Sequence, residues 1–133
     1  TELKKNPKIY FMDSGLRNYI IKNFNSVENR PDKSGLAEGV ALTGLINLLQ
    51  DKAEIMYWRT LAKAEVDFIL KTGKENIPVE VKYQNFKKPE ISRSFRSFLS
   101  EYSPARAVVF TKNFWGEMEV GTTEIKFVPL CYL

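Results

Sequence analysis

The chain has 133 residues with no histidine and a single cysteine, Cys131, which excludes histidine-based catalytic sites and the zinc and iron–sulfur sites that need several cysteines. It has 20 lysines and arginines against 16 aspartates and glutamates, which gives a net charge of +4. Any chemistry must therefore rest on carboxylates, lysines, hydroxyls or a cofactor, and the metals that suit carboxylates are magnesium and manganese.

The N-terminal part of the chain predicts a strand and a helix ahead of the main body of the domain. Residues 8–12 (KIYFM) have the aromatic and β-branched content of a short strand. Asp13 is expected to cap a helix over residues 16–24. The polar residues 25–34, with a proline among them, are typical of an exposed loop.

The rest of the chain predicts two helices and several strands. Residues 35–50 carry the strongest helical pattern. Three strands follow at spacings that fit antiparallel hairpins, over residues 54–59, 65–70 and 77–83. The remaining elements are an amphipathic helix over 89–102, a strand buried on both faces over 105–111, a turn region over 117–121 and a closing strand over 125–130. Pro129 places that last strand at an edge of the sheet, because proline has no backbone N–H to donate.

These elements predict one domain over residues 1–133, with a lead-in strand and helix in residues 1–25 and the core in residues 35–133. The charged opening TELKKNPK, which begins at Thr1, suggests a piece cut from a longer polypeptide. The sequence has no signal peptide, no stretch of 18 apolar residues and no GxxxxGK[ST] loop. We therefore expect a cytoplasmic protein that has no membrane segment and no ATP site of that type.

Charged residues interrupt two of the predicted strands. In the strand over residues 65–70, strict alternation places three residues on one face: Glu65, Asp67 and Ile69. The opposite face takes Val66, Phe68 and Leu70. In the next strand Glu80 and Lys82 share a face roughly 7 Å apart, so a carboxylate and an amine can meet one target.

The first long helix adds a further carboxylate. Glu38 projects within about 40° of the apolar stripe formed by Leu42, Leu45 and Leu49. Burying an unpaired carboxylate costs several kcal/mol. Glu38 is therefore expected to be neutralised, either by a divalent cation or by Lys82.

The order of these residues, a helix glutamate, a strand aspartate and a Glu-x-Lys strand 13 residues later, resembles the PD-(D/E)XK nuclease superfamily. The strings KIYFMDSGL, GLAEGVALTGLINLL, YWRTLAKAEVDFIL, IPVEVKY and IKFVPL are similar to the C-terminal domain of unknown function that follows the nucleotide-binding and winged-helix parts of many prokaryotic AAA+ ATPases. Gly39 departs from that family, which usually carries a polar residue such as asparagine there. The resemblance implies a restriction-endonuclease-like α/β fold, with an α-β-β-β-α-β core and a mixed sheet flanked by helices.

The same resemblance implies a catalytic site made of Glu38, Asp67, Glu80 and Lys82. Asp67 and Glu80 would hold one or two Mg²⁺ or Mn²⁺ ions, with Glu38 helping directly or through water. Lys82 would position the attacking water and stabilise the charge that grows on the phosphate. The implied reaction is hydrolysis of a phosphodiester, with DNA as the expected substrate.

The charge distribution fits a nucleic-acid partner. The net excess of +4 lies entirely between Lys82 and Arg106. Four cations of this region are expected to contact the phosphate backbone: Lys87, Lys88, Arg93 and Arg96. The ATPase portion of the same polypeptide is a second expected partner, and self-association of the chain is left open.

The residues leave other interpretations open. The four-residue site can be a buried ion-pair network in a domain that performs no chemistry, and the domain can be an inactive DNA-binding or protein-interaction accessory of the ATPase. The basic region can simply be a solvated surface.

Four further residues are expected to have structural roles. Glu65 is expected to form a salt bridge rather than bind a metal. Tyr57 and Trp58 fit core packing better than base stacking. Cys131 is expected to be a partly buried, unreactive thiol.

Overall fold

The computed structural model describes residues 7–133, so the first six residues of the charged opening lie outside the described part of the chain. Its helices are α1 (Ser14–Ile20), α2 (Lys33–Leu49) and α3 (Arg93–Tyr102). Its strands are β1 (Glu54–Arg59), β2 (Glu65–Lys71), β3 (Asn76–Lys82), β4 (Arg106–Thr111), β5 (Gly116–Val120) and β6 (Thr123–Pro129). Short 3₁₀ turns lie at Val27–Asn29, Gln50–Lys52 and Leu130–Tyr132.

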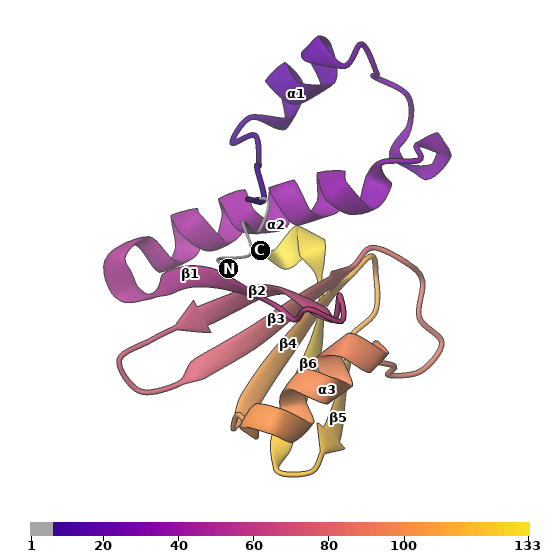
Figure 1. Cartoon of the computed structure of the whole chain (residues 1–133). Coiled ribbons are helices and arrows are strands. Elements are labelled where there is room, and N and C mark those ends of the chain that lie inside the picture. Colours follow the sequence, from indigo (N-terminus) through magenta and orange to yellow (C-terminus); the bar gives the residue numbers. More distant parts are fainter. Residues whose placement is uncertain (1–6) are drawn as a thin grey trace.

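The six strands form one mixed sheet in the order β1-β2-β3-β4-β6-β5. The first three strands are antiparallel neighbours, β3, β4 and β6 run parallel, and β5 is antiparallel to β6. Helix α2 covers one face of the sheet and α3 covers the other (Figure 1). The predicted α/β class and mixed sheet are confirmed, and the predicted order of elements is present from α2 to β4.

Two apolar layers hold the helices to the sheet. The layer under α2 contains Ala37, Ala41 and Leu45 of the helix, packed on Phe68, Leu70, Val79, Val81, Phe110 and Leu130. The layer under α3 contains Phe95, Phe98 and Leu99, packed on Val66, Ile69, Ala107, Val109, Ile125 and Phe127. Strands between two such layers are apolar on both faces. This explains why β4 is an almost continuous apolar run, as predicted.

The N-terminal segment differs from its prediction. Residues 8–12 form no strand, because their backbone pairs with no strand among the described residues. Asp13 does cap α1, accepting the Leu16 N–H at 2.9 Å, but the helix ends at Ile20 rather than at residue 24. Helix α1 contains no buried residue and lies on the side of α2 away from the sheet (Figure 1). None of the described helices is long and apolar enough to cross a membrane.

The C-terminal strands correct two further predictions. Residues 116–120, part of the expected turn region, form strand β5. Strand β6 is therefore not at an edge but lies between β4 and β5. Pro129 lies beyond the β5 ladder, which ends where Gly116 pairs with Phe127, so only β4 flanks the proline. Cys131 is exposed rather than partly buried, and in the terminal 3₁₀ turn its neighbour Leu130 is the buried residue.

Candidate active site

A cavity of about 370 Å³ opens at the end of the sheet where β2 begins and β3 ends. Its walls include all four residues predicted from the sequence: Glu38 of α2, Asp67 of β2, and Glu80 and Lys82 of β3. The start of α3 and the residues just before it complete the wall. Four side chains from three elements are thus brought to one cavity.

Asp67 lies at a β-bulge. The register between β1 and β2 shifts between Met56 and Trp58, so that two β2 residues, Asp67 and Phe68, oppose one residue of β1. The strict alternation predicted for this strand is therefore wrong, since Val66 packs in the α3 layer and Phe68, two residues further on, packs in the α2 layer. Bulges re-aim side chains and are frequent next to active sites.

The Asp67 carboxylate lies where β2 and β3 separate. The backbone ladder of the two strands reaches Phe68 opposite Val79, and beyond it Asp67 Oδ2 accepts the Val81 N–H at 2.8 Å. Burial raises the pKa of Asp67 to about 6; the Val81 N–H acts in the opposite direction, and the Glu38 carboxylate acts in the same direction as burial. A cation placed beside Asp67 would counter this shift, because it stabilises the ionised carboxylate.

Glu80 is the most buried carboxylate of the cavity, with 5 % of the residue exposed. Its Oε1 accepts the hydroxyl of Ser92 at 2.5 Å and lies 3.7 Å from the Lys82 ammonium. Its Oε2 is buried and has no hydrogen-bond partner among the described residues. Burial raises the pKa of Glu80, while the Ser92 hydroxyl and the Lys82 charge act against that shift.

Ser92 is a site residue that the sequence analysis did not select. Its hydroxyl oxygen caps α3 by accepting the Phe95 N–H at 3.1 Å, and the same hydroxyl donates to Glu80. One side chain therefore ties the start of α3 to the end of β3. The signal was present, since a serine before an amphipathic pattern is a preferred N-cap, but the helix was expected to start at residue 89.

The other carboxylates of the cavity are neutralised by the N-terminal segment. The Lys8 ammonium lies 3.7 Å from Glu38 Oε2 and 3.9 Å from Asp67 Oδ1, and forms an ion pair with Glu65 Oε1. The Tyr10 hydroxyl donates to Glu38 Oε2 at 3.1 Å. Glu38 was expected to be neutralised by a divalent cation or Lys82; in this structure Lys8 and Tyr10 contact it instead.

Glu65 has the salt-bridge role predicted for it, since it pairs with Arg59 at 3.8 Å as well as with Lys8. Burial opposes the charge on Lys8, but its bond to Glu65 and the surrounding negative charge outweigh burial and raise its pKa above the usual range. Lys8 is therefore a firmly charged partner of three carboxylates that line the cavity.

The carboxylates of the cavity supply oxygen ligands of the kind that a divalent cation needs. Within residues 7–133, no three acidic side chains are placed to coordinate one ion. Magnesium, however, is commonly held by one or two carboxylates together with water and substrate phosphate. Asp67 and Glu80 supply two carboxylates, and the unpartnered Oε2 of Glu80 is a buried acceptor that a cation would satisfy. The residues present therefore fit a magnesium site with two carboxylate ligands.

The predicted nucleic-acid residues lie on the surface after β3. Lys87 and Lys88 are exposed in the connection to α3, and Arg93 and Arg96 are exposed on that helix. Lys88 lies 3.8 Å from Glu90, an exposed pair that contributes little to stability. Tyr83, Gln84, Ser92 and Ser94 of the same region line the cavity, whereas the four predicted cations are not among its lining residues.

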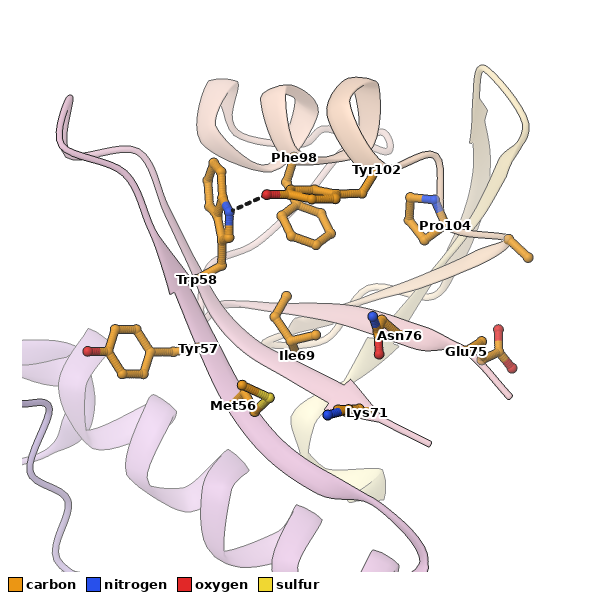
Figure 2. A pocket seen from close by; sticks show the side chains of 11 residues that line it. Met56, Tyr57, Trp58, Ile69, Lys71, Glu75, Asn76, Phe98, Tyr102 and Pro104 are labelled. Atoms are coloured by element: carbon orange, nitrogen blue, oxygen red, sulfur yellow. Dashed lines mark hydrogen bonds between the residues drawn. The ribbon is translucent and has the colours of Figure 1, made fainter. Parts of the chain in front are cut away.

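A larger cavity, about 540 Å³, lies elsewhere and lacks the predicted chemistry. It is bounded by Trp58, Phe98 and Tyr102, and its acidic residue, Glu75, is paired with Arg106 (Figure 2). The Trp58 indole N–H donates to the Tyr102 hydroxyl at 3.3 Å, and its ring meets Phe98 edge-on at 5.2 Å. Core packing is thus confirmed for Trp58.

The neighbouring tyrosine does not follow the same prediction. Tyr57 points to the other side of β1 and is 39 % exposed, so the expectation that it packs in the core is wrong (Figure 2).

A family model described as a domain of unknown function (DUF4143) matches residues 33–132, a range that runs from the first residue of α2 almost to the end of the chain. No curated protein matches the chain.

Proposed function

We propose that this chain, which belongs to the DUF4143 family of domains of unknown function, hydrolyses phosphodiester bonds of DNA with the help of a divalent cation. Asp67 and Glu80 would hold Mg²⁺ or Mn²⁺, Lys82 would act on the phosphate, and Glu38 would help at the edge of the site. The proposal extends to a restriction-endonuclease-like fold, which the order of α2, β1, β2, β3, α3 and β4 supports.

The proposal rests mainly on the environment of Glu80. A carboxylate that is 5 % exposed, has a raised pKa and keeps one oxygen without a partner is costly to the folded state. Such groups are characteristic of functional sites, where the missing partner is a ligand. Asp67, with its own raised pKa, faces the same cavity.

The chemistry assigned to each group follows from its position. A bound divalent cation supplies a more acidic water and neutralises charge on the phosphate. Lys82 is 41 % exposed at the side chain and lies 3.7 Å from Glu80, so its ammonium reaches the cavity and can stabilise the negative charge that develops during attack. The Ser92 hydroxyl holds Oε1 of Glu80, and Oε2 keeps no hydrogen-bond partner among the described residues. Water adds to phosphorus, one P–O ester bond breaks, and the leaving oxygen takes up a proton.

DNA as the substrate is supported by the exposed cations that follow β3. Lys87, Arg93 and Arg96 are exposed and have no ion-pair partner within the described residues. Such side chains attract a phosphate backbone and leave sequence preference to other contacts. We further propose that the domain works next to the ATPase portion of a longer polypeptide, as its resemblance implies.

The test is DNA cleavage by the full chain with MgCl₂ or MnCl₂, on supercoiled, branched and single-stranded DNA. Asp67→Asn, Glu80→Gln and Lys82→Met are each expected to lower the rate at least about 100-fold. Glu75→Gln is the matched control, because Glu75 lies at the other end of β3 and pairs with Arg106. Cleavage that survives in the Asp67→Asn/Glu80→Gln double variant would show that the activity belongs to a contaminant.

A second candidate function is an accessory domain that binds protein or DNA without cleaving it. It is favoured by the apolar surface of the N-terminal segment, where six side chains are more than half exposed: Ile9, Met12, Leu16, Tyr19, Ile20 and Phe24. It predicts that Tyr19→Ser weakens association with the ATPase portion, measured by calorimetry, while Glu80→Gln has no effect on it. Metal-dependent cleavage lost in Glu80→Gln would rule out a purely accessory role.

A further inference from the structure

The N-terminal segment places a cation where the proposed site needs one. The Lys8 ammonium lies within 4 Å of carboxylate oxygens of Glu38, Glu65 and Asp67, which come from α2 and β2. Its side chain is 21 % exposed, so the contact is largely shielded from water. One of the three carboxylates, Asp67, is also a proposed ligand of the divalent cation.

The segment that carries Lys8 is held by few contacts. Residues 7–12 form no backbone ladder with the rest of the described chain, and the side chains of Ile9 and Met12 are mostly exposed. Besides Lys8, the main anchor is Tyr10, which donates to Glu38 and packs its ring 5.9 Å from that of Phe68. Segments with little buried apolar surface and few backbone bonds open at low free-energy cost.

We propose that residues 7–12 form an intramolecular plug, in which the Lys8 ammonium lies against three carboxylates of the acidic cavity and competes with the divalent cation for Asp67. This inference rests on the proposed function, because it assigns regulation to the same site. A divalent cation bound at Asp67 would lie close to the Lys8 charge, and like charges repel strongly in a shielded cavity. Withdrawal of the segment removes one positive charge and frees the carboxylate.

Competition of this kind is reciprocal. If Lys8 weakens cation binding, the cation must displace Lys8 to the same extent. Anything that holds residues 7–12 away from the cavity would then raise the affinity for the cation, and with it the activity. Glu38 and Glu65 lose their Lys8 partner at the same time and become available to water or to the cation.

Calorimetric titration of MnCl₂ into the full chain tests the plug directly. Lys8→Gln removes the charge and keeps most of the stem, and it is expected to bind Mn²⁺ about tenfold more tightly than the wild type. Lys8→Arg keeps the charge and is expected to bind like the wild type. Lys74→Gln is the matched control, since Lys74 is exposed in the hairpin between β2 and β3.

The outcomes separate this proposal from the proposed function. Equal Mn²⁺ affinity in the wild type and Lys8→Gln overturns the plug and leaves the metal site standing. No binding in either protein overturns both the metal site and the plug. Should Lys8→Gln fail to fold, Tyr10→Phe removes only the hydroxyl that Glu38 accepts, loosens the segment, and is expected to raise the affinity by a smaller factor, about twofold to threefold.

Chemical modification of Lys8 supplies a readout that a purely structural role would not move. With a plug, added MnCl₂ raises the rate at which an amine reagent modifies the Lys8 side chain in the wild type, because the ammonium leaves its carboxylate partners. A structural salt bridge predicts an unchanged or lower rate, because a ligand that binds the folded state tightens it.

Discussion

The two sides of the acidic cavity treat their carboxylates in opposite ways. On the α2 side, Glu38 and Glu65 each contact the Lys8 ammonium, and Glu38 also accepts the Tyr10 hydroxyl. On the α3 side, Glu80 is more deeply buried, yet one of its oxygens has no hydrogen-bond partner in the described chain. The contacts on the α2 side neutralise its carboxylates, whereas on the α3 side Lys82 faces only one oxygen of Glu80 and the other oxygen has no partner among the described residues.

The difference teaches where to look for function. A carboxylate with a complete set of partners stabilises the fold and needs nothing more, whereas one that is buried and incompletely paired costs stability that the chain must recover elsewhere. Asp67 stands between the two sides, since it accepts the Val81 N–H and also lies 3.9 Å from Lys8. The α3 side is thus expected to carry the chemistry, and the α2 side to regulate access to it.

The largest expected difference between the two sides of the cavity is in catalysis. Glu80→Gln keeps the shape of the side chain but removes its charge, and is expected to lower metal-dependent DNA cleavage about 10³-fold. Glu65→Gln makes the same change on the α2 side and is expected to keep the rate within about threefold. Single-turnover rates on supercoiled DNA measure both. Equal losses in the two variants would mean that the sides are not functionally distinct.

The second prediction concerns pH. The pKa of Asp67 is about 6 in the folded protein against 3.8 for an unperturbed carboxyl, so the folded state binds this proton more tightly than the unfolded state does. Stability therefore falls as pH rises from about 4 to about 6, by at most about 3 kcal/mol, and the penalty stays in full above that window.

Asp67→Asn removes the titrating group while its amide oxygen can still accept the Val81 N–H. The variant should match the wild type near pH 3.5 and exceed it in free energy of unfolding at pH 7. Urea unfolding of both proteins at several pH values measures the difference. If the difference in free energy of unfolding does not change with pH, the ionised Asp67 carboxylate does not lower the stability of the folded protein.

Local sequence patterns predicted much of the fold. The strand at residues 54–59 has the predicted bounds, the strands near 65–70 and 77–83 lie within one residue of theirs, and α2 begins two residues early. These segments obey their patterns because each faces a continuous apolar layer. The gathering of Glu38, Asp67, Glu80 and Lys82 was also anticipated, and the cavity brings the four together.

What the sequence did not predict depends on contacts between distant segments. The bulge at Asp67 exists only in relation to β1, and strict alternation within one strand does not reveal it. Lys8 looked like the start of a strand, but its ammonium finds an acidic cluster that forms only when α2 and β2 meet. Strand β5 alternates half-buried and exposed residues, and its short pattern became a strand only by pairing with β6.

The third prediction compares two lysines that lie against carboxylates of the cavity. Lys8 is 21 % exposed and is shared by three carboxylates, so Lys8→Gln is expected to lower the free energy of unfolding by about 1–2 kcal/mol. Lys82 is 41 % exposed and lies 3.7 Å from one oxygen of Glu80, so Lys82→Gln is expected to change it by no more than about 0.5 kcal/mol. Thermal and urea unfolding measure both. A larger loss of stability in Lys82→Gln than in Lys8→Gln would mean that the lysine on the α3 side is the one that stabilises the fold.

The last prediction compares two helix N-caps that make the same kind of hydrogen bond in different surroundings, and its expected effect on cleavage is the smallest. Asp13 caps α1 and Ser92 caps α3, and replacing either by alanine removes one hydrogen bond to a backbone N–H, at a cost of about 1 kcal/mol or less for the exposed cap. Only Ser92 also donates its hydroxyl to Glu80, so Ser92→Ala removes that bond and loosens the orientation of the carboxylate. Cleavage should fall about tenfold in Ser92→Ala and remain unchanged in Asp13→Ala.

Ser92→Thr, which restores a hydroxyl at the same position, should recover most of the rate if Ser92 acts by positioning Glu80. A Ser92→Ala variant that loses stability but keeps full activity would reduce this residue to a helix cap.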